Sequence, residues 1–191
     1  MDIDQSEKEM KAFRGWQLNS PVFIVSTGRS GTTTLTQILQ MHPDVCCLNE
    51  AKPALRTEGC MTWSGYYSLK RIEQRIRLKR EKLISQITQN RFVYIEGTPP
   101  ASHLINMLYS LFNARFVHLF TDGREFVRRA ADKGWHEKSN PVGEFLTMLR
   151  RRFLLGIMGG RKIDRRMKPP SDLKTQIEKL AWLWVTVNEV I

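Results

Sequence analysis

The chain has 191 residues, enough for one domain with a buried core, and its 30 lysines and arginines against 19 aspartates and glutamates give a formal net charge of +11. This charge favours anionic partners, although it does not by itself distinguish a nucleotide from RNA or heparin. The three cysteines, Cys46, Cys47 and Cys60, have no metal-ligand spacing, so we expect reduced, mostly buried thiols and no metal site. The sequence has no signal peptide and no run long enough to span a bilayer, so we expect a soluble, cytoplasmic chain.

Hydrophobic patterning predicts alternating strands and helices after an N-terminal extension over residues 1–19. The apolar, β-branched run 22–25 is typical of a central parallel strand, and from Thr32 the apolar spacing becomes helical. Further strands are expected at 45–48, 92–95 and 115–120, and further helices at 67–89, 99–112, after 124, and within 171–191, with 51–66 irregular. This order predicts one α/β domain over 1–191, with three α/β/α layers around a P-loop-like central parallel sheet.

The most informative segment is the loop between the first strand and the first helix, residues 26–33. The first backbone N–H groups of a helix are unpaired and the helix dipole favours negative charge there, so this position suits an anion. Glycines let the backbone approach a phosphate closely, hydroxyl side chains can donate to it, and Arg29 adds a fixed positive charge. We interpret the loop as a phosphate or sulfate site made by Thr27, Gly28, Arg29, Ser30, Gly31, Thr32 and Thr33.

The loop differs from the Walker A loop of ATP-binding proteins, which reads Gly-x-x-x-x-Gly-Lys-Ser/Thr. Only two residues separate Gly28 from Gly31, and Thr32 stands where the Walker lysine would be. These differences argue against an ATPase, although an ordinary P-loop nucleotide kinase stays a third interpretation. In its form Thr-Gly-Arg-Ser-Gly-Thr-Thr the loop resembles the 5′-phosphosulfate loop of sulfotransferases that use 3′-phosphoadenosine 5′-phosphosulfate (PAPS).

The resemblance continues after the second strand. There the segment His42-Pro-Asp-Val45, followed by Glu50 and Lys52, is similar to the tyrosylprotein and carbohydrate sulfotransferases. In that family the glutamate is the base that takes the proton of the acceptor hydroxyl, and a cation follows two residues later. The resemblance therefore implies a catalytic role for Arg29, Glu50 and Lys52. The alternatives are a capping or salt-bridged Glu50 and a solvated surface Lys52.

In the related proteins, residues at the end of the fourth strand hold the 3′-phosphate of the nucleotide. The pattern there begins with Arg-Asp-Gly/Pro-Arg. A serine follows eight residues after the first arginine, often with a further arginine four residues beyond the serine. Here Thr121 replaces the first arginine, Arg129 stands at the serine position, and Lys133 stands at the last. The resemblance points to Arg124, Arg129 and Lys133 as nucleotide ligands, with Arg129 supplying the charge that Thr121 lacks. A plain basic helix would have the same composition.

Two further departures concern the third strand and the C-terminus. Related proteins often read Glu-Lys-Thr/Ser-Pro after the third strand, whereas this chain has Gly97 in place of the lysine. They also continue beyond the tryptophan-containing helix near which this sequence ends, so we expect the C-terminal part of the usual domain to be missing. The resemblance implies in-line transfer of a sulfuryl group from PAPS, without a metal, to an acceptor hydroxyl.

The acceptor is open, since tyrosine, sugar and lipid hydroxyls all fit, and an acidic peptide or a glycan is a candidate. The alternative function is a catalytically impaired relative that binds PAPS, its desulfated product or a polyanion.

We interpret the dense positive charge from Arg71 to Lys82 as a solvated helix face on which an acidic acceptor could dock. The basic clusters at 150–152 and 161–168 lack the interleaved aromatic residues of a base-stacking surface, so nucleic acid is not expected as a partner.

Overall fold

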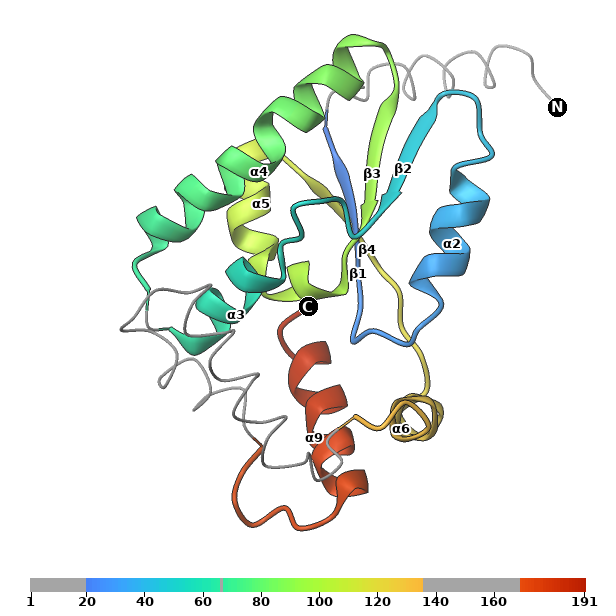
Figure 1. Ribbon diagram of the computed structural model, residues 1–191, viewed down its shortest axis with the longest axis vertical. Coiled ribbons are helices and arrows are strands. Elements are labelled where there is room, and N and C mark those ends of the chain that lie inside the picture. The colour runs from blue at the N-terminus through green and yellow to red at the C-terminus, as the bar shows by residue number, and fades with distance from the viewer. Residues whose placement is uncertain (1–19, 66, 136–168) are drawn as a thin grey trace, which may run out of the picture.

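The computed structural model describes residues 20–65, 67–135 and 169–191 (Figure 1). Its centre is a four-stranded, fully parallel sheet in the order β2-β3-β1-β4, which confirms the predicted parallel α/β arrangement. The strands are β1 (Val22–Val25), β2 (Val45–Asn49), β3 (Val93–Gly97) and β4 (Arg115–His118). The N-terminal extension 1–19 and the basic clusters at 150–152 and 161–168 lie outside the described residues.

Helices cover both faces of the sheet, as the three-layer prediction requires (Figure 1). Side chains alternate between the two faces along a strand, and β3 shows which helix lies on which face. Gly97 is in close contact with α2, whereas its neighbour Glu96 binds Arg80 of α4 on the opposite face. The helices are α2 (Thr32–Leu39), α3 (Arg56–Ser64), α4 (Leu69–Gln89), the 3₁₀ helix η1 (Pro99–Leu104), α5 (Ile105–Phe112), α6 (Gly123–Ala131) and α9 (Gln176–Asn188).

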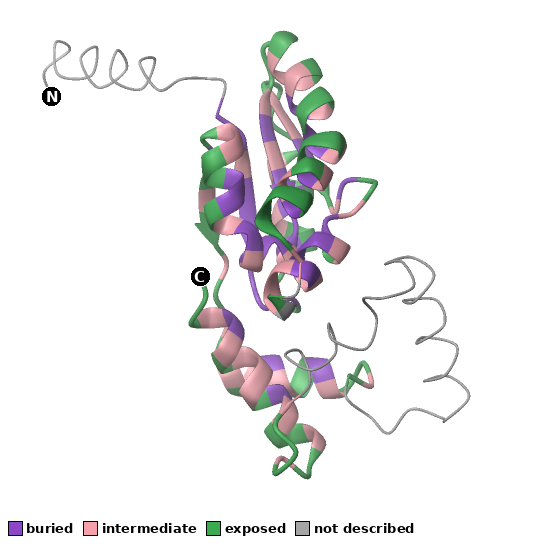
Figure 2. Cartoon of the chain, turned by 90° about the vertical axis from the view of Figure 1, so that its left-hand side faces the viewer, coloured by how far each residue is buried: buried purple, intermediate pink, exposed green. Residues whose placement is uncertain are grey.

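The main hydrophobic core lies between the sheet and the layer formed by α4 and α5. It contains Phe23 of β1, Tyr94 of β3, Ile72 and Ile76 of α4, and Leu108 of α5, all fully or almost fully buried. Figure 2 shows buried residues along the sheet and on the sides of the helices that face it. Burial of each such side chain stabilises the fold by roughly 1.5–3 kcal/mol.

The prediction that residues 51–66 are irregular was wrong, because Arg56–Ser64 form α3. This segment has a central glycine and no clear apolar period, so its own sequence favours a helix only weakly. Tertiary contacts supply the rest: Glu58 of α3 is fully buried and forms ion pairs with Arg75 and Lys79 of α4. The helix therefore depends on a partner far along the chain.

The two helices at the carboxyl edge of the sheet, α6 and α9, pack on each other around a second, smaller core (Figure 1). Phe126 and Ala130 of α6 meet Leu180 of α9 there. The capping box predicted at Thr175 and Glu178 is present and opens α9. Because α9 packs on α6, it covers the segment that leads out of β4.

The cysteine prediction is confirmed in that all three thiols are free, although only Cys47 is fully buried and the other two are half-buried. Burial raises the pKa of Cys47 to about 11, so this thiol is inert at neutral pH. No helix among the described residues is both long enough and apolar enough to cross a membrane.

Candidate functional site

The candidate site lies at the carboxyl ends of the strands, where the connections leaving β1 and β3 diverge. The chain leaves β1 toward α2 on one face of the sheet and leaves β3 toward η1 and α5 on the other. Neighbouring strands that lead to opposite faces leave a crevice between them, and ligands of open parallel sheets bind in such crevices. The 26–31 segment after β1, the 50–55 segment after β2 and the 119–122 segment after β4 all reach this edge.

The loop after β1 has the backbone of an anion-binding site. Gly28, Arg29 and Gly31 have positive φ angles of 82°, 56° and 87°, a conformation that turns successive N–H groups toward one side. Within the described residues, no acceptor is bonded to any of the consecutive backbone N–H groups from Arg29 to Thr34. These donors stand at the N-terminus of α2, where the helix dipole adds partial positive charge.

The hydroxyl groups of the loop bond to one another and to the backbone of Gly28. Ser26 Oγ lies 3.2 Å from Thr32 Oγ1 and accepts from the N–H of Gly28 at 3.1 Å. The hydroxyls of Thr27 and Ser30 both donate to the Gly28 carbonyl, at 3.2 and 3.1 Å. In this structure these hydrogen bonds hold the loop in shape, and the backbone N–H groups without an acceptor are the donors left for a ligand.

Cationic side chains reach this loop from two directions. The Arg29 side chain is exposed, and no acidic residue among those described pairs with it. Arg129 of α6 donates from Nη1 to the Arg29 carbonyl at 3.3 Å, which places the end of α6 against the loop. The Trp135 ring also lies over the loop, since a Cβ atom at Gly28 would be 3.3 Å from Trp135 Cη2.

The three residues expected at the 3′-phosphate are not brought together equally. Arg129 contacts the loop but also forms an ion pair with Glu125 at 2.6 Å. Arg124 is exposed and pairs with Asp122, and no hydrogen bond or ion pair within the described ranges joins Arg124 or Lys133 to the loop. Hydrogen bonds from Arg128 and then Arg129 lower the pKa of Glu125 to about 2, so Glu125 stays charged and competes with any anion for Arg129.

Glu50 and Lys52 follow β2, whose last residue, Asn49, contacts the first turn of α2. The side-chain amide of Asn49 donates to Thr33 Oγ1 at 3.5 Å, which joins the end of β2 to the start of the loop helix. Glu50 is half-buried with φ at 46°, and its N–H donates to the Gly97 carbonyl at 2.8 Å. No partner among the described residues occupies its carboxylate, which excludes the capped or salt-bridged Glu50 within that part of the chain. Lys52 is exposed.

Two departures from the family pattern have structural reasons. At Gly97, a Cβ atom would lie 2.5 Å from Thr36 Cγ2 and 2.8 Å from Thr32 Cγ2, so α2 packs where the lysine of related proteins would start. At Thr121, the backbone carbonyl accepts from the indole N–H of Trp184 at 3.0 Å. Through this hydrogen bond α9 holds the segment at which the resemblance found in the sequence leads one to expect a phosphate-binding arginine.

An aromatic cluster joins α3, η1 and α9 at the same edge. His103 meets the Trp63 ring edge-on, with 4.0 Å between centroids, and Trp63 in turn lies 6.4 Å from the Trp182 ring of α9. Burial lowers the pKa of His103 to about 4, so the ring is neutral at physiological pH. A neutral imidazole here serves packing between the helices, and its protonation state does not change near neutral pH.

The folded-state pKa of His103 lies below its ordinary value of 6.5, so the neutral ring stabilises the fold above pH 6.5 and this contribution is lost as pH falls toward 4. Because the ring is only half-buried, we expect a loss of about 2 kcal/mol in the free energy of unfolding over this range. Urea unfolding at several pH values measures it. His103→Phe should flatten the pH dependence, whereas the exposed control His42→Gln should keep it; equal slopes in all three proteins would contradict the prediction.

The sequence interpretation missed two residues near this edge. Trp135 gave no signal, because nothing local shows that it folds back over Gly28. Arg80 gave a signal that could have been recognised: it lies four residues after Ile76 and four before Ile84, in the middle of the apolar side of α4, and it is fully buried. A charged residue in that position needs a buried partner, and Glu96 provides it. The prediction that the charged residues from Arg71 to Lys82 form a solvated helix face was therefore wrong for Arg80, which is buried.

Other parts of the molecule fit an anionic nucleotide less well. A hollow of about 490 Å³ at the opposite edge of the sheet is lined by Met41, His42, Cys46, Phe92 and their neighbours, and no lysine, arginine or acidic residue lines it. Across 20–65, 67–135 and 169–191 no cluster of three or more histidine, cysteine or acidic side chains could hold a metal ion.

Comparison with known proteins assigns the family. The family model described as the sulfotransferase family matches residues 21–153, a range that includes the loop after β1, Glu50 and all of α6. No curated protein and no solved structure matches the chain. The matched range covers well over half of the 191 residues and contains the unpaired N–H groups at the start of α2, so the chain belongs to the sulfotransferase family.

Proposed function

We propose that this protein transfers a sulfuryl group from PAPS to an acceptor hydroxyl. The observation that carries the proposal is the row of unpaired N–H groups from Arg29 to Thr34, with an exposed arginine in the same loop. A phosphosulfate is a compact anion with several acceptor oxygens, and it fits donors that converge at a helix N-terminus. The family assignment supports the same conclusion for the reaction class.

In the proposed reaction the carboxylate of Glu50 takes the proton of the acceptor hydroxyl as its oxygen attacks sulfur in line. The new oxygen–sulfur bond forms while the bond from sulfur to the bridging oxygen breaks, and the electron pair stays on the 5′-phosphate of the leaving 3′,5′-phosphoadenosine. Arg29 and the loop N–H groups stabilise the charge that grows on that phosphate. Lys52, two residues beyond Glu50, adds positive charge on the acceptor side.

For the 3′-phosphate we propose Arg129, with Lys133 and Arg124 as further ligands. Arg129 already contacts the loop that would hold the other end of the nucleotide. In this structure the Arg129 guanidinium forms an ion pair with Glu125. To bind the 3′-phosphate, the guanidinium would have to contact both groups or release Glu125. This competition is the specific reason to keep a second candidate function, a relative that binds the nucleotide or another polyanion weakly and without turnover.

A thermal-shift series with a transfer assay tests the proposal. A ligand present at about 100 times its dissociation constant should raise the melting temperature by about 5–10 °C. We expect this shift with PAPS and with its desulfated product, together with transfer of labelled sulfate to at least one of a tyrosine peptide, a glycan or a lipid alcohol. Nucleotide binding without transfer would favour the impaired relative. A shift that needs ATP and magnesium would favour a kinase, and a shift with heparin or RNA alone would favour a polyanion-binding protein.

A further inference from the structure

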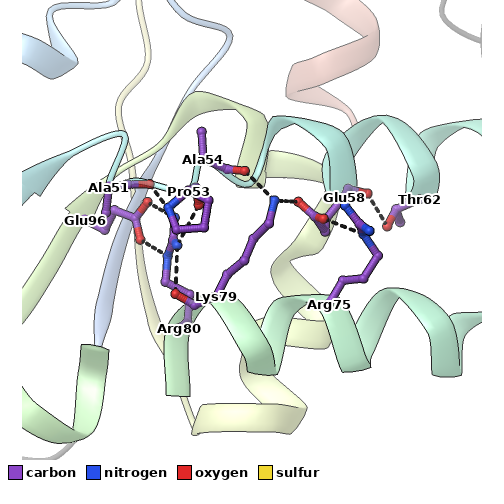
Figure 3. Close-up of polar contacts among 9 residues, drawn as sticks. All are labelled: Ala51, Pro53, Ala54, Glu58, Thr62, Arg75, Lys79, Arg80 and Glu96. Atoms are coloured by element: carbon purple, nitrogen blue, oxygen red, sulfur yellow. Dashed lines mark hydrogen bonds and ion pairs between the residues drawn. The ribbon is translucent and has the colours of Figure 1, made fainter. Parts of the chain in front are cut away.

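We propose that Arg80 is a positioning residue for the acceptor side of the site, acting through the segment that carries Glu50 and Lys52. This segment, residues 50–54, is called the strap below. The inference rests on the proposed function in one respect only, the role given to Glu50. The anchoring itself follows from contacts between α4, β3 and the strap (Figure 3).

The Arg80 side chain is completely buried, and its guanidinium divides its donors between the Glu96 carboxylate and backbone carbonyls (Figure 3). Nε and Nη2 bind the two carboxylate oxygens of Glu96 at 2.7 and 2.8 Å. The remaining donors bind backbone carbonyls: Nη2 binds that of Ala51 and Nη1 that of Pro53, each at 3.0 Å, and Nη1 also donates to the carbonyl of its neighbour Lys79 at 3.1 Å. One planar side chain thus joins the sheet to carbonyls on both sides of Lys52.

Glu96 is itself held in place, which makes the anchor stiff. It extends from β3, and Tyr94 of the same strand donates its hydroxyl to Glu96 Oε2 at 2.7 Å. Burial and the neighbouring Glu96 raise the pKa of Tyr94, so this hydroxyl keeps its proton and stays a donor. The next residue of β3, Gly97, accepts from the N–H of Glu50 at 2.8 Å. The strap is therefore tied to β3 at Glu50 directly and at Ala51 and Pro53 through Arg80.

A second cation of α4 holds the far end of the strap. Lys79 Nζ donates to the Ala54 carbonyl at 2.7 Å and also binds the buried carboxylate of Glu58 in α3 (Figure 3). Arg75 binds the other oxygen of Glu58 at 2.7 Å. Two neighbouring residues of α4 thus fix the carbonyls of Ala51, Pro53 and Ala54.

The position of Arg80 on α4 indicates that its charge serves to bind the strap and does not serve core packing. Ile72, Ile76 and Ile84 precede and follow it on the buried side of α4, and an apolar residue would continue this row without the desolvation cost of a buried ion pair. Glu50 needs support because its φ of 46° lies in the left-handed region, which residues other than glycine adopt at a cost. The guanidinium fork satisfies two strap carbonyls beside this residue and so fixes the direction of the Glu50 side chain.

The test compares Arg80→Lys with Ile84→Ala, a control on the same side of α4 one turn further on, whose aliphatic side chain cannot hydrogen-bond to the strap. An ammonium group cannot bind Glu96 and two carbonyls in the same fork, so the strap is released while a positive charge remains. For Arg80→Lys we expect kcat to fall by about ten- to a hundredfold, with KM for PAPS changed by less than about twofold. Without donor, hydrogen exchange at the Glu50 amide, which donates to the Gly97 carbonyl, should become at least about tenfold faster, and exchange in 26–31 should stay unchanged.

Each outcome decides the proposal. Ile84→Ala, assayed below its melting temperature, should keep wild-type kcat and wild-type exchange in the strap; an equal loss in both variants would reduce Arg80 to a general stabilising residue. An unchanged kcat in Arg80→Lys would overturn the proposal. If Arg80→Lys fails to fold, Lys79→Gln, which frees the Ala54 carbonyl and leaves Glu58 paired with Arg75 alone, should give the same pattern with a smaller fall. If the wild-type protein transfers nothing from PAPS, the proposed function fails, and strap exchange still decides the anchoring.

Discussion

Replacement of Glu50 by glutamine is expected to lower kcat for sulfuryl transfer by about 10²- to 10⁴-fold, the usual contribution of a positioned general base. Glutamine keeps the size of the side chain and the backbone hydrogen bond to Gly97, but its amide cannot take a proton. The loop after β1 is untouched, so the thermal shift produced by the desulfated nucleotide should stay at its wild-type value. Transfer of labelled sulfate from PAPS to a saturating acceptor measures the loss.

Two further variants separate proton transfer from other roles of Glu50. Glu81→Gln removes a carboxylate from the exposed side of α4, where it pairs with Arg77 at 3.4 Å, and it should leave kcat unchanged. Glu50→Ala opens space for a small external carboxylate, so formate should restore part of the activity. A Glu50→Gln protein with nearly wild-type kcat would show that another group, or water, takes the proton.

Replacement of Arg29 by alanine is expected to lower kcat by about 10²- to 10³-fold, the range seen when one preorganised electrostatic stabiliser is removed. The negative charge on the 5′-phosphate grows as the bond to sulfur breaks, and Arg29 is the cationic side chain that belongs to the loop itself. Binding should weaken less than turnover falls, because the backbone N–H groups from Arg29 to Thr34 remain. Single-turnover transfer of labelled sulfate, with direct titration of the desulfated nucleotide, separates the two effects.

Arg91→Ala is a matched control for this variant. Arg91 is an exposed arginine with a φ of 64°, close to the 56° of Arg29, but it precedes β3 at the amino edge of the sheet. Any cost of placing alanine in the left-handed region is therefore common to both variants, and Arg91→Ala should keep full turnover. Undiminished transfer by Arg29→Ala would rule out the proposed role of this side chain and leave the N–H groups as the main stabilisers.

Much of the fold was predictable from short-range patterns in the sequence. The run Val22–Val25 is β1 with the predicted bounds, and α2 begins at Thr32, where the spacing changes. The predicted strand at 92–95 begins at Val93 in the structure, and the expected strand at 115–120 ends at His118. The ends of elements are set by what they contact across the sheet, which local spacing does not encode.

The candidate site divides in the same way. The sequence by itself determined the loop after β1, because the positive φ angles at Gly28 and Gly31 and the start of α2 depend on residues next to one another. Only the tertiary structure decided that α3 forms, that Arg129 contacts the loop from a hundred residues away, and that Arg80 binds the strap. The physical reason is that a buried charge reveals its need for a partner, while the identity of that partner depends on which strand and which loop the packed core brings to it.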